Sequence, residues 1–281
     1  MKILSYLDEL KNRTIEHQLA AFAGQMAYFF VLSFFPLLIF IVSIVSKLNI
    51  NYSFLVDAMK NILPDNISLL ITDFISQSIN TEGSAVLSVS GLIMLYSASR
   101  AVNALQRAIN TSYEVIETRN IIVVKLLGML YTLLFTFIIV LSLIIPTIVK
   151  DLVDFTGEWL SFNINENLFY FFQYLRNLLL LSSVVIVIIS IYTFLPNKKM
   201  HLSDIYPGAL FAIAGSLLTN LIFSKVVVVL TDYSILYGSL SAIIAFMIWI
   251  YLLAQIIILG AEINAIHVNR IAKEKIKYDN Q

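Results

Sequence analysis

Residues 238–267 decide the fold, and they read GSLSAIIAFMIWIYLLAQIIILGAEINAIH. Glu262 is the one charged residue of this stretch. A helix needs about 20 mostly apolar residues to cross the hydrocarbon core of a bilayer, because every backbone amide must find its partner within the segment. The stretch therefore predicts a membrane-spanning α-helix, and it defines the kind of segment to look for elsewhere.

Five further segments have the same apolar character and sufficient length. The six predicted spans cover residues 20–46, 84–104, 126–149, 168–195, 205–230 and 238–267. The sequence thus predicts an all-α integral membrane protein built as a bundle of six transmembrane helices.

The composition of the whole chain agrees with this fold class. Hydrophobic residues make up 59% of the 281 positions and charged residues 13%, with a mean hydropathy of +0.86, whereas soluble domains contain about 25% charged residues. The formal net charge is zero, so no overall field would attract nucleic acid. There is no cysteine, which excludes disulfides, thiolate metal sites and cysteine nucleophiles.

Lysine and arginine are distributed unevenly between the two ends of the predicted bundle. Three precede the first span, four lie in the second loop, two in the fourth loop and four in the C-terminal tail. The opposite side has only Lys47, Lys60, Lys150 and Lys225. Because cytoplasmic loops of membrane proteins are enriched in these residues, both termini are predicted to be cytoplasmic.

Three segments outside the spans complete the predicted organisation. Residues 1–19 form a cytoplasmic interfacial helix, since Ile3, Leu4, Leu7 and Leu10 share one face. Residues 48–83 form an external amphipathic segment of two short helices around Pro64. The bundle extends over residues 20–270, and residues 271–281 form a cytoplasmic basic tail.

Polar side chains within the spans are candidates for lining a path through the bundle, because they are costly in lipid and usually face protein or water. They repeat at helical spacing in the first, fourth and sixth spans. The candidate lining residues are Gln25, Pro36, Ser43, Gln173, Arg176, Ser183, Tyr251, Gln255 and Glu262. Pro36 should also kink its helix, and Arg176 is interpreted as reaching the outer interface, with an anion or headgroup contact as the alternative.

Glu262 lies well inside an apolar run and needs a partner. We expect a buried ion pair with Arg100, which lies near the same end of its own span. A proton or substrate relay through Glu262 is the alternative. In the fifth span, Gly208, Ala212 and Gly215 share a face with Thr219, which predicts close helix packing.

The chain lacks the usual sequence signatures of catalysis. The three histidines are isolated, so no zinc-ligand spacing exists, and neither a phosphate-binding P-loop nor a GxSxG nucleophile motif is present. Acidic residues on the predicted cytoplasmic side are scattered rather than convergent. We therefore expect no enzyme, no catalytic residues, no cofactor and no metal site.

Several short motifs together resemble the YihY/virulence factor BrkB family, historically labelled ribonuclease BN. They are AYFFVLSFFPL at 27–37, YTFLPN at 192–197, PGA at 207–209, YGSL at 237–240 and GAEINA at 260–265. The resemblance extends over nearly the whole chain. It implies a bacterial inner-membrane protein with six spans, and it supplies no established functional residues.

These observations favour a transport role with an unknown substrate, and lipid or amphiphile translocation is the preferred version. A non-transporting scaffold of envelope biogenesis is the alternative from another class, and a membrane-bound hydrolase or ribonuclease is the third. The expected partners are membrane lipids rather than nucleic acid, with a homo-oligomer or an envelope protein left open.

Overall fold

The structure is a computed structural model that describes residues 2–47, 72, 84–138, 141, 166–230 and 240–279. All regular secondary structure in this part of the chain is helical. The helices are α1 (Lys2–Glu16), α2 (Leu19–Lys47), α5 (Ser84–Ser112), an unlabelled helix Ile121–Ile138, α7 (Glu166–Phe194), α8 (Leu202–Leu230) and α10 (Leu240–Asp279). The predicted all-α class is confirmed.

Each predicted span overlaps one of the long helices within the described residues, but several boundaries differ. α5 and α10 continue past the predicted ends of the second and sixth spans. The predicted basic tail is therefore helical at its start. The third helix starts at Ile121 rather than at residue 126, because the Asn120 side chain accepts a hydrogen bond from the backbone amide of Ile122 and caps its first turn. The predicted external segment 48–83 lies outside the described residues, apart from Thr72.

Within the described residues, four helices are long and apolar enough to cross a membrane. The qualifying segments are Leu19–Phe40, Ile121–Ile138, Leu202–Phe223 and Ile243–Ala272, and a shorter apolar helix covers Leu181–Phe194. Large apolar side chains are exposed along them, including Leu32, Phe137 and Leu221. Such a surface suits contact with lipid tails, since a water-facing surface would be polar.

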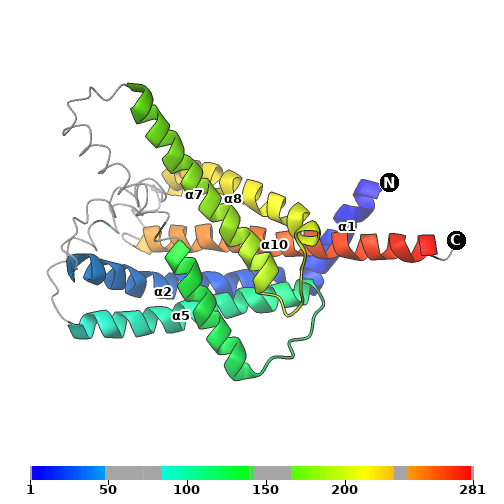
Figure 1. Ribbon diagram of the computed structural model, residues 1–281, viewed down its shortest axis with the longest axis horizontal. Helices are drawn as coiled ribbons and strands as arrows, with labels where there is room; N and C mark the ends of the chain where they lie inside the picture. Colours follow the sequence, from blue (N-terminus) through cyan, green and yellow to red (C-terminus); the bar gives the residue numbers. More distant parts are fainter. Residues whose placement is uncertain are drawn as a thin grey trace.

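The helices are arranged around a long central α10 (Figure 1). α2 packs along α5 and also contacts α10, while α8 packs along the other side of α10. α7 runs obliquely across the bundle and contacts α8. Both chain ends lie at the same end of the molecule, where α1 and the last turns of α10 extend beyond the other helices (Figure 1).

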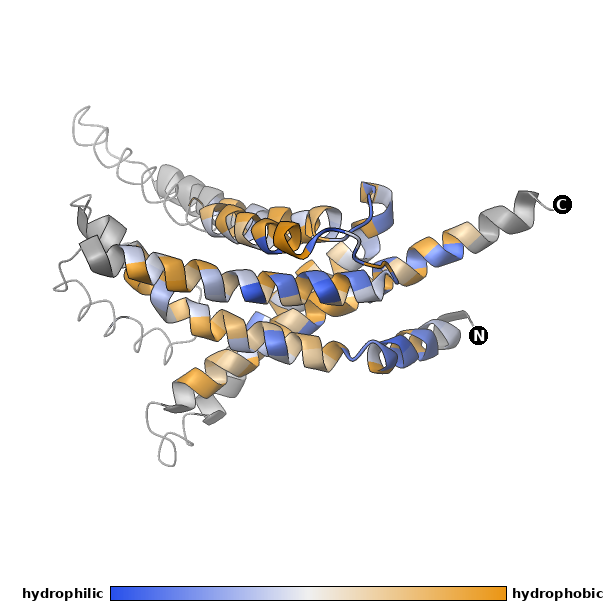
Figure 2. Cartoon of the chain, turned by 90° about the horizontal axis from the view of Figure 1, so that it is seen from below, coloured by the Kyte–Doolittle hydropathy of each residue, from blue (hydrophilic) through white to orange (hydrophobic). Residues whose placement is uncertain are grey.

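The two ends of the molecule differ in polarity. Hydrophilic residues gather toward the end that carries both termini, in α1 and in the loops that follow α5 and α7 (Figure 2). Hydrophobic residues dominate the helices away from that end (Figure 2). We call this polar region, where both termini lie, the terminal end of the bundle.

α8 and α10 approach each other closely at a pair of glycines. A β-carbon on Gly208 would collide with the backbone oxygen of Gly260, and one on Gly260 would collide with the Tyr192 hydroxyl. The amide of Gly208 donates a hydrogen bond of 2.7 Å to the buried Asn264 side chain. Ala212 and Thr219 are also buried on this face, so the predicted small-residue packing face of this span is confirmed.

Candidate functional site

Glu262 is the centre of a buried charge network at the terminal end of the bundle. Its side chain is 0% exposed, although it lies within the apolar segment Ile243–Ala272 of α10. One carboxylate oxygen accepts a hydrogen bond of 2.8 Å from Arg13 Nε, and the other lies 2.6 Å from His17 Nδ1. Both oxygens of this carboxylate are therefore held by side chains from the last turn of α1 and from the turn that joins α1 to α2.

The local sequence explains how these two side chains reach Glu262. Arg13 and His17 are four residues apart, so they lie on the same face at the end of α1. A two-residue turn joins α1 to α2, and Gln18 adopts a left-handed backbone conformation with φ 51°. This tight turn fixes the direction of α1 relative to α2 and brings its polar face to α10.

Arg13 also binds the end of α5. Its Nη1 lies 2.6 Å from the Glu114 carboxylate, and its Nη2 donates a hydrogen bond of 2.6 Å to the Ser112 carbonyl oxygen. Burial by itself would lower the pKa of Arg13, but the hydrogen bonds to Glu262 and Glu114 outweigh it and raise the pKa. One guanidinium therefore joins α1, α5 and α10. We call Arg13, His17, Ser112, Glu114 and Glu262 the α1 clasp.

Glu114 occupies an unusual backbone position. Its φ of 54° is left-handed, and the amides of Glu114 and Val115 bond back to the carbonyls of Thr111 and Asn110 to close the end of α5. Glycine is preferred at such a helix-ending position, because a side chain there is strained. A glutamate at this position supplies the carboxylate that Arg13 binds.

The predicted ion pair between Arg100 and Glu262 does not form. Arg100 is exposed on α5, its Nη1 donates to the Tyr96 hydroxyl at 2.8 Å, and its guanidinium stacks 4.7 Å from the centre of the Phe29 ring. Its side chain leans toward the apolar part of α5, as long side chains in helices generally lean toward the N-terminus. Arg13 and His17 take the place predicted for Arg100.

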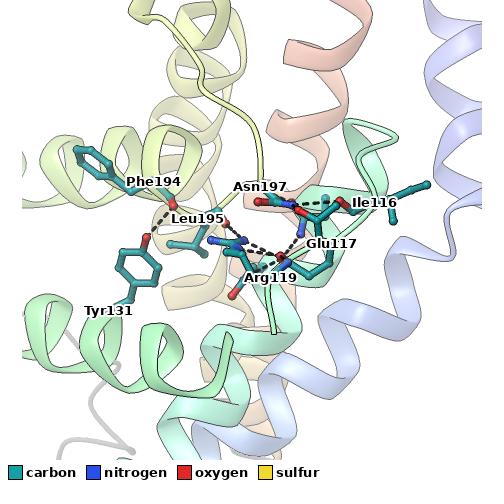
Figure 3. Close-up of polar contacts among 10 residues, drawn as sticks. Ile116, Glu117, Arg119, Tyr131, Phe194, Leu195 and Asn197 are labelled. Atoms are coloured by element: carbon teal, nitrogen blue, oxygen red, sulfur yellow. Dashed lines mark hydrogen bonds and ion pairs between the residues drawn. The ribbon is translucent and has the colours of Figure 1, made fainter. Parts of the chain in front are cut away.

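A second network ties the loop after α5 to the loop after α7 (Figure 3). Arg119 Nη2 lies 2.7 Å from the Glu117 carboxylate and also donates to the Leu195 carbonyl oxygen at 3.4 Å. Asn197 donates from its backbone amide to Asn110 Oδ1 and from its side chain to the Ile116 carbonyl oxygen. The Tyr131 hydroxyl donates to the Phe194 carbonyl oxygen (Figure 3). These contacts hold both loops in one arrangement.

Glu117 should make stability depend on pH in the acid range. Hydrogen bonds from Arg119 hold its pKa at about 2, below the ordinary 4.5, although burial opposes them. The ionised form therefore stabilises the fold fully above pH 4.5, and this contribution is lost as the pH falls from about 4.5 to about 2. After allowing for solvent screening, we expect the ionised Glu117 to contribute about 1–2 kcal/mol to the free energy of unfolding.

The measurement is the thermal unfolding midpoint in detergent for the native protein and for Glu117→Gln. The native protein should unfold at the higher temperature above pH 4.5, and the difference should shrink toward pH 2. A difference that stays constant over this range would show that the Glu117 carboxylate does not carry the effect.

The structure does not bring the predicted lining residues together into one path. Gln25 accepts a hydrogen bond of 3.0 Å from Arg107 of α5. Tyr251 accepts one of 2.7 Å from Gln255, while Glu262 belongs to the α1 clasp. Pro36 and Ser183 are half-buried. The side chains of Ser43, Gln173 and Arg176 lie outside those that the structure describes.

Sequence reasoning missed most of the clasp. A signal for it was available, because Arg13 and His17 share the polar face of an amphipathic helix directly before the first span. The role of Glu114 had no such signal, since it depends on a backbone turn. Among the described residues, no group of three or more His, Cys, Asp or Glu side chains is placed to hold a metal ion.

Comparison with known proteins identifies relatives over nearly the full length of the chain. Residues 10–281 match the family described as virulence factor BrkB. The ribonuclease-like protein YfkH of Bacillus subtilis is 32% identical over 265 residues, which cover 94% of this chain and 95% of that protein. A UPF0761 membrane protein of Aliivibrio fischeri is 27% identical over 271 residues, covering 93% of this chain and 82% of its own.

A UPF0761 membrane protein of Vibrio vulnificus is 24% identical over 256 residues, covering 86% of this chain and 76% of its own. No solved structure matches the chain. The resemblance seen in the short motifs is thus confirmed by a match that covers the clasp, the spans and both polar loops. The chain belongs to the virulence factor BrkB family of membrane proteins.

Proposed function

We propose that this membrane protein translocates an amphiphilic molecule, preferably a lipid, across the bilayer, with the α1 clasp as the gate at the terminal end. In this proposal six helices span the membrane, both termini are cytoplasmic, and the chain is not an enzyme. The observation that carries the proposal is the complete burial of Glu262 within an apolar helix, with both oxygens bound by a helix outside the spans. Ionisable groups at membrane depth mark transport pathways more often than ordinary packing sites.

The clasp has the properties expected of a gate. Its contacts are ion pairs and hydrogen bonds between α1, α5 and α10 rather than packed apolar surfaces, so they can separate and reform without rebuilding a core. Nearby, the buried Gln106 Oε1 and Ser112 Oγ have no hydrogen-bond partner among the described residues. Buried polar atoms of this kind favour a role in binding a polar group.

An envelope scaffold is the second candidate. The network in Figure 3 presents two connected loops at the terminal end, with Thr118 and Asn197 at their surface. Loops held rigidly by such contacts suit the docking of a protein partner. The word ribonuclease belongs to the name of the Bacillus subtilis relative, and the chain itself has no nuclease motif to support that reaction.

Locking the clasp should stop translocation. Glu9 and Arg270 form an outer ion pair of 3.0 Å between α1 and α10, and both side chains are more than a third exposed. Because the chain has no cysteine, the double variant Glu9→Cys/Arg270→Cys can be linked specifically by a short bismaleimide. In liposomes containing fluorescently labelled phosphatidylglycerol, the unlinked variant should move the lipid between leaflets and the linked protein should lose at least about 90% of this rate.

Each single-cysteine variant treated with the same reagent is the matched control and should translocate normally. Equal rates for the linked and unlinked double variant would exclude the clasp as a gate. No translocation above protein-free liposomes by any unlinked protein would overturn the transport proposal itself.

A further inference from the structure

α5 carries an exposed stripe that changes from apolar to basic along its length. Val89, Tyr96, Arg100 and Arg107 are all exposed, and at 100° per residue their directions lie within about 40° of one another. Leu92 and Ile93, 69% and 48% exposed, widen the apolar part. We call these six residues the α5 stripe.

The α5 stripe lies at the depth of a membrane-spanning segment. Arg107 donates to Gln25 and Arg100 stacks on Phe29, and both partners belong to the apolar segment Leu19–Phe40 of α2. The seven residues between the two arginines correspond to about 10 Å along the helix. The two guanidinium groups therefore lie at two depths, with Arg107 nearer the terminal end and Arg100 deeper in the bundle.

Neither arginine is neutralised within the described part of the chain. No described carboxylate lies within ion-pair distance of Arg100 or Arg107. Within the described part of the chain, Arg100 donates a side-chain hydrogen bond to the neutral Tyr96 hydroxyl and Arg107 donates one to the neutral Gln25 amide oxygen. A charged group at this depth is costly without a counter-charge, and most of its N–H donors remain for another acceptor.

An anionic phospholipid supplies what the α5 stripe lacks. Its phosphate offers a negative charge and the oxygen acceptors that a guanidinium binds in a bidentate manner. Its acyl chains match the exposed apolar residues Val89, Leu92 and Ile93, and the exposed Tyr28 and Leu32 of α2 continue this surface. Aromatic rings beside arginine, as in Phe29 and Tyr96, are typical of the interface where headgroups lie.

We infer that the α5 stripe is a binding site for an anionic phospholipid, with its phosphate on Arg107 and Arg100 and its acyl chains along Val89 and Leu92. The site uses no residue of the α1 clasp. It therefore goes beyond the proposed function, and lipid binding here would stand even if the chain moved no lipid across the bilayer.

The test compares lipid binding to purified full-length protein in detergent by native mass spectrometry. Dioleoyl phosphatidylglycerol should bind at least about tenfold more tightly than dioleoyl phosphatidylcholine, since each arginine near a surface adds a favourable contribution for anionic lipid. The double variant Arg100→Gln/Arg107→Gln should reduce this preference to less than about twofold. Arg100→Lys/Arg107→Lys should retain part of it, because lysine keeps the charge and loses the bidentate contact.

The matched control is Lys198→Gln/Lys199→Gln, which removes two exposed charges from the loop after α7 and should keep the full preference. An unchanged preference in the double arginine variant would overturn the proposal. Displacement of the lipid by millimolar inorganic phosphate would also overturn it, because the site would then recognise a free anion.

A second copy of the chain is the competing occupant. Since the protein contains no cysteine, Leu92→Cys places a single thiol on the α5 stripe. We expect this variant to remain monomeric after oxidation in phosphatidylglycerol-containing liposomes. Efficient disulfide-linked dimers would show that protein rather than lipid covers the stripe.

Discussion

Gly208→Ala should destabilise the protein by about 3 kcal/mol or more and strongly reduce the amount of folded protein in the membrane. The added methyl group would meet the Gly260 carbonyl oxygen and lie 2.5 Å from Asn264 Oδ1. Backbone cannot rotate away as a side chain can, so α8 and α10 would have to separate. That separation would also break the hydrogen bond from the Gly208 amide to Asn264.

The measurement is the thermal unfolding midpoint in detergent, together with the yield of monodisperse protein. Gly260→Ala should behave in the same way, because its methyl group would meet the Tyr192 hydroxyl and lie 2.7 Å from the Gly208 oxygen. Gly24→Ala in α2 is the matched control, as nothing lies within 4 Å of its added carbon. Equal midpoints for Gly208→Ala and Gly24→Ala would show that the two helices are farther apart than the structure places them.

Arg13→Gln should lower the free energy of unfolding by about 3–5 kcal/mol, because it leaves the fully buried Glu262 with His17 as its remaining partner. Glu262→Gln should cost less, about 1–2 kcal/mol, because Arg13 keeps Glu114 and the Ser112 carbonyl. The double variant Arg13→Gln/Glu262→Gln should lose less stability than the sum of the losses in the two single variants, since it leaves neither charge of the pair behind without its partner.

Unfolding in mixed micelles of increasing SDS content would give the free energies of unfolding of the native protein, the two single variants and the double variant. These four values form a double-mutant cycle. Arg100→Gln is the control, because it removes the same charge from an exposed position and should change stability by less than about 0.5 kcal/mol. A larger loss for Arg100→Gln than for Arg13→Gln would contradict the pairing of Glu262 with α1.

The fold was largely predictable because membrane helices are specified by local composition. Each predicted span overlaps a helix within the described residues, and the small-residue face of α8 correctly predicted a close contact. The polar residues beyond residue 104 indicate that α5 continues past its span, but they do not predict that this end is buried against other elements. Its buried Gln106 and Asn110 bind Glu117 in the following loop.

The candidate site was only partly predictable. The apolar surroundings of Glu262 predicted a buried carboxylate in need of a partner, and the structure buries and pairs it. The identity of that partner was predicted wrongly, since helical spacing gives the face of a residue but not the neighbour that the face meets. The turn at His17 and Gln18 decides this, and its left-handed backbone leaves no clear mark in a sequence without glycine there.

The pairing of Arg13 with Glu262 has a consequence for how the protein is made. These residues are separated by 249 positions, so α1 leaves the ribosome first and its guanidinium can meet Glu262 only after α10 has been synthesised. A nascent chain that stops before α10 leaves Arg13 with Glu114 and the Ser112 carbonyl as its partners, whereas a chain that has lost α1 inserts Glu262 without either of its two partners. The burial of Glu262 is therefore completed only when the first and last helices of the same polypeptide have met.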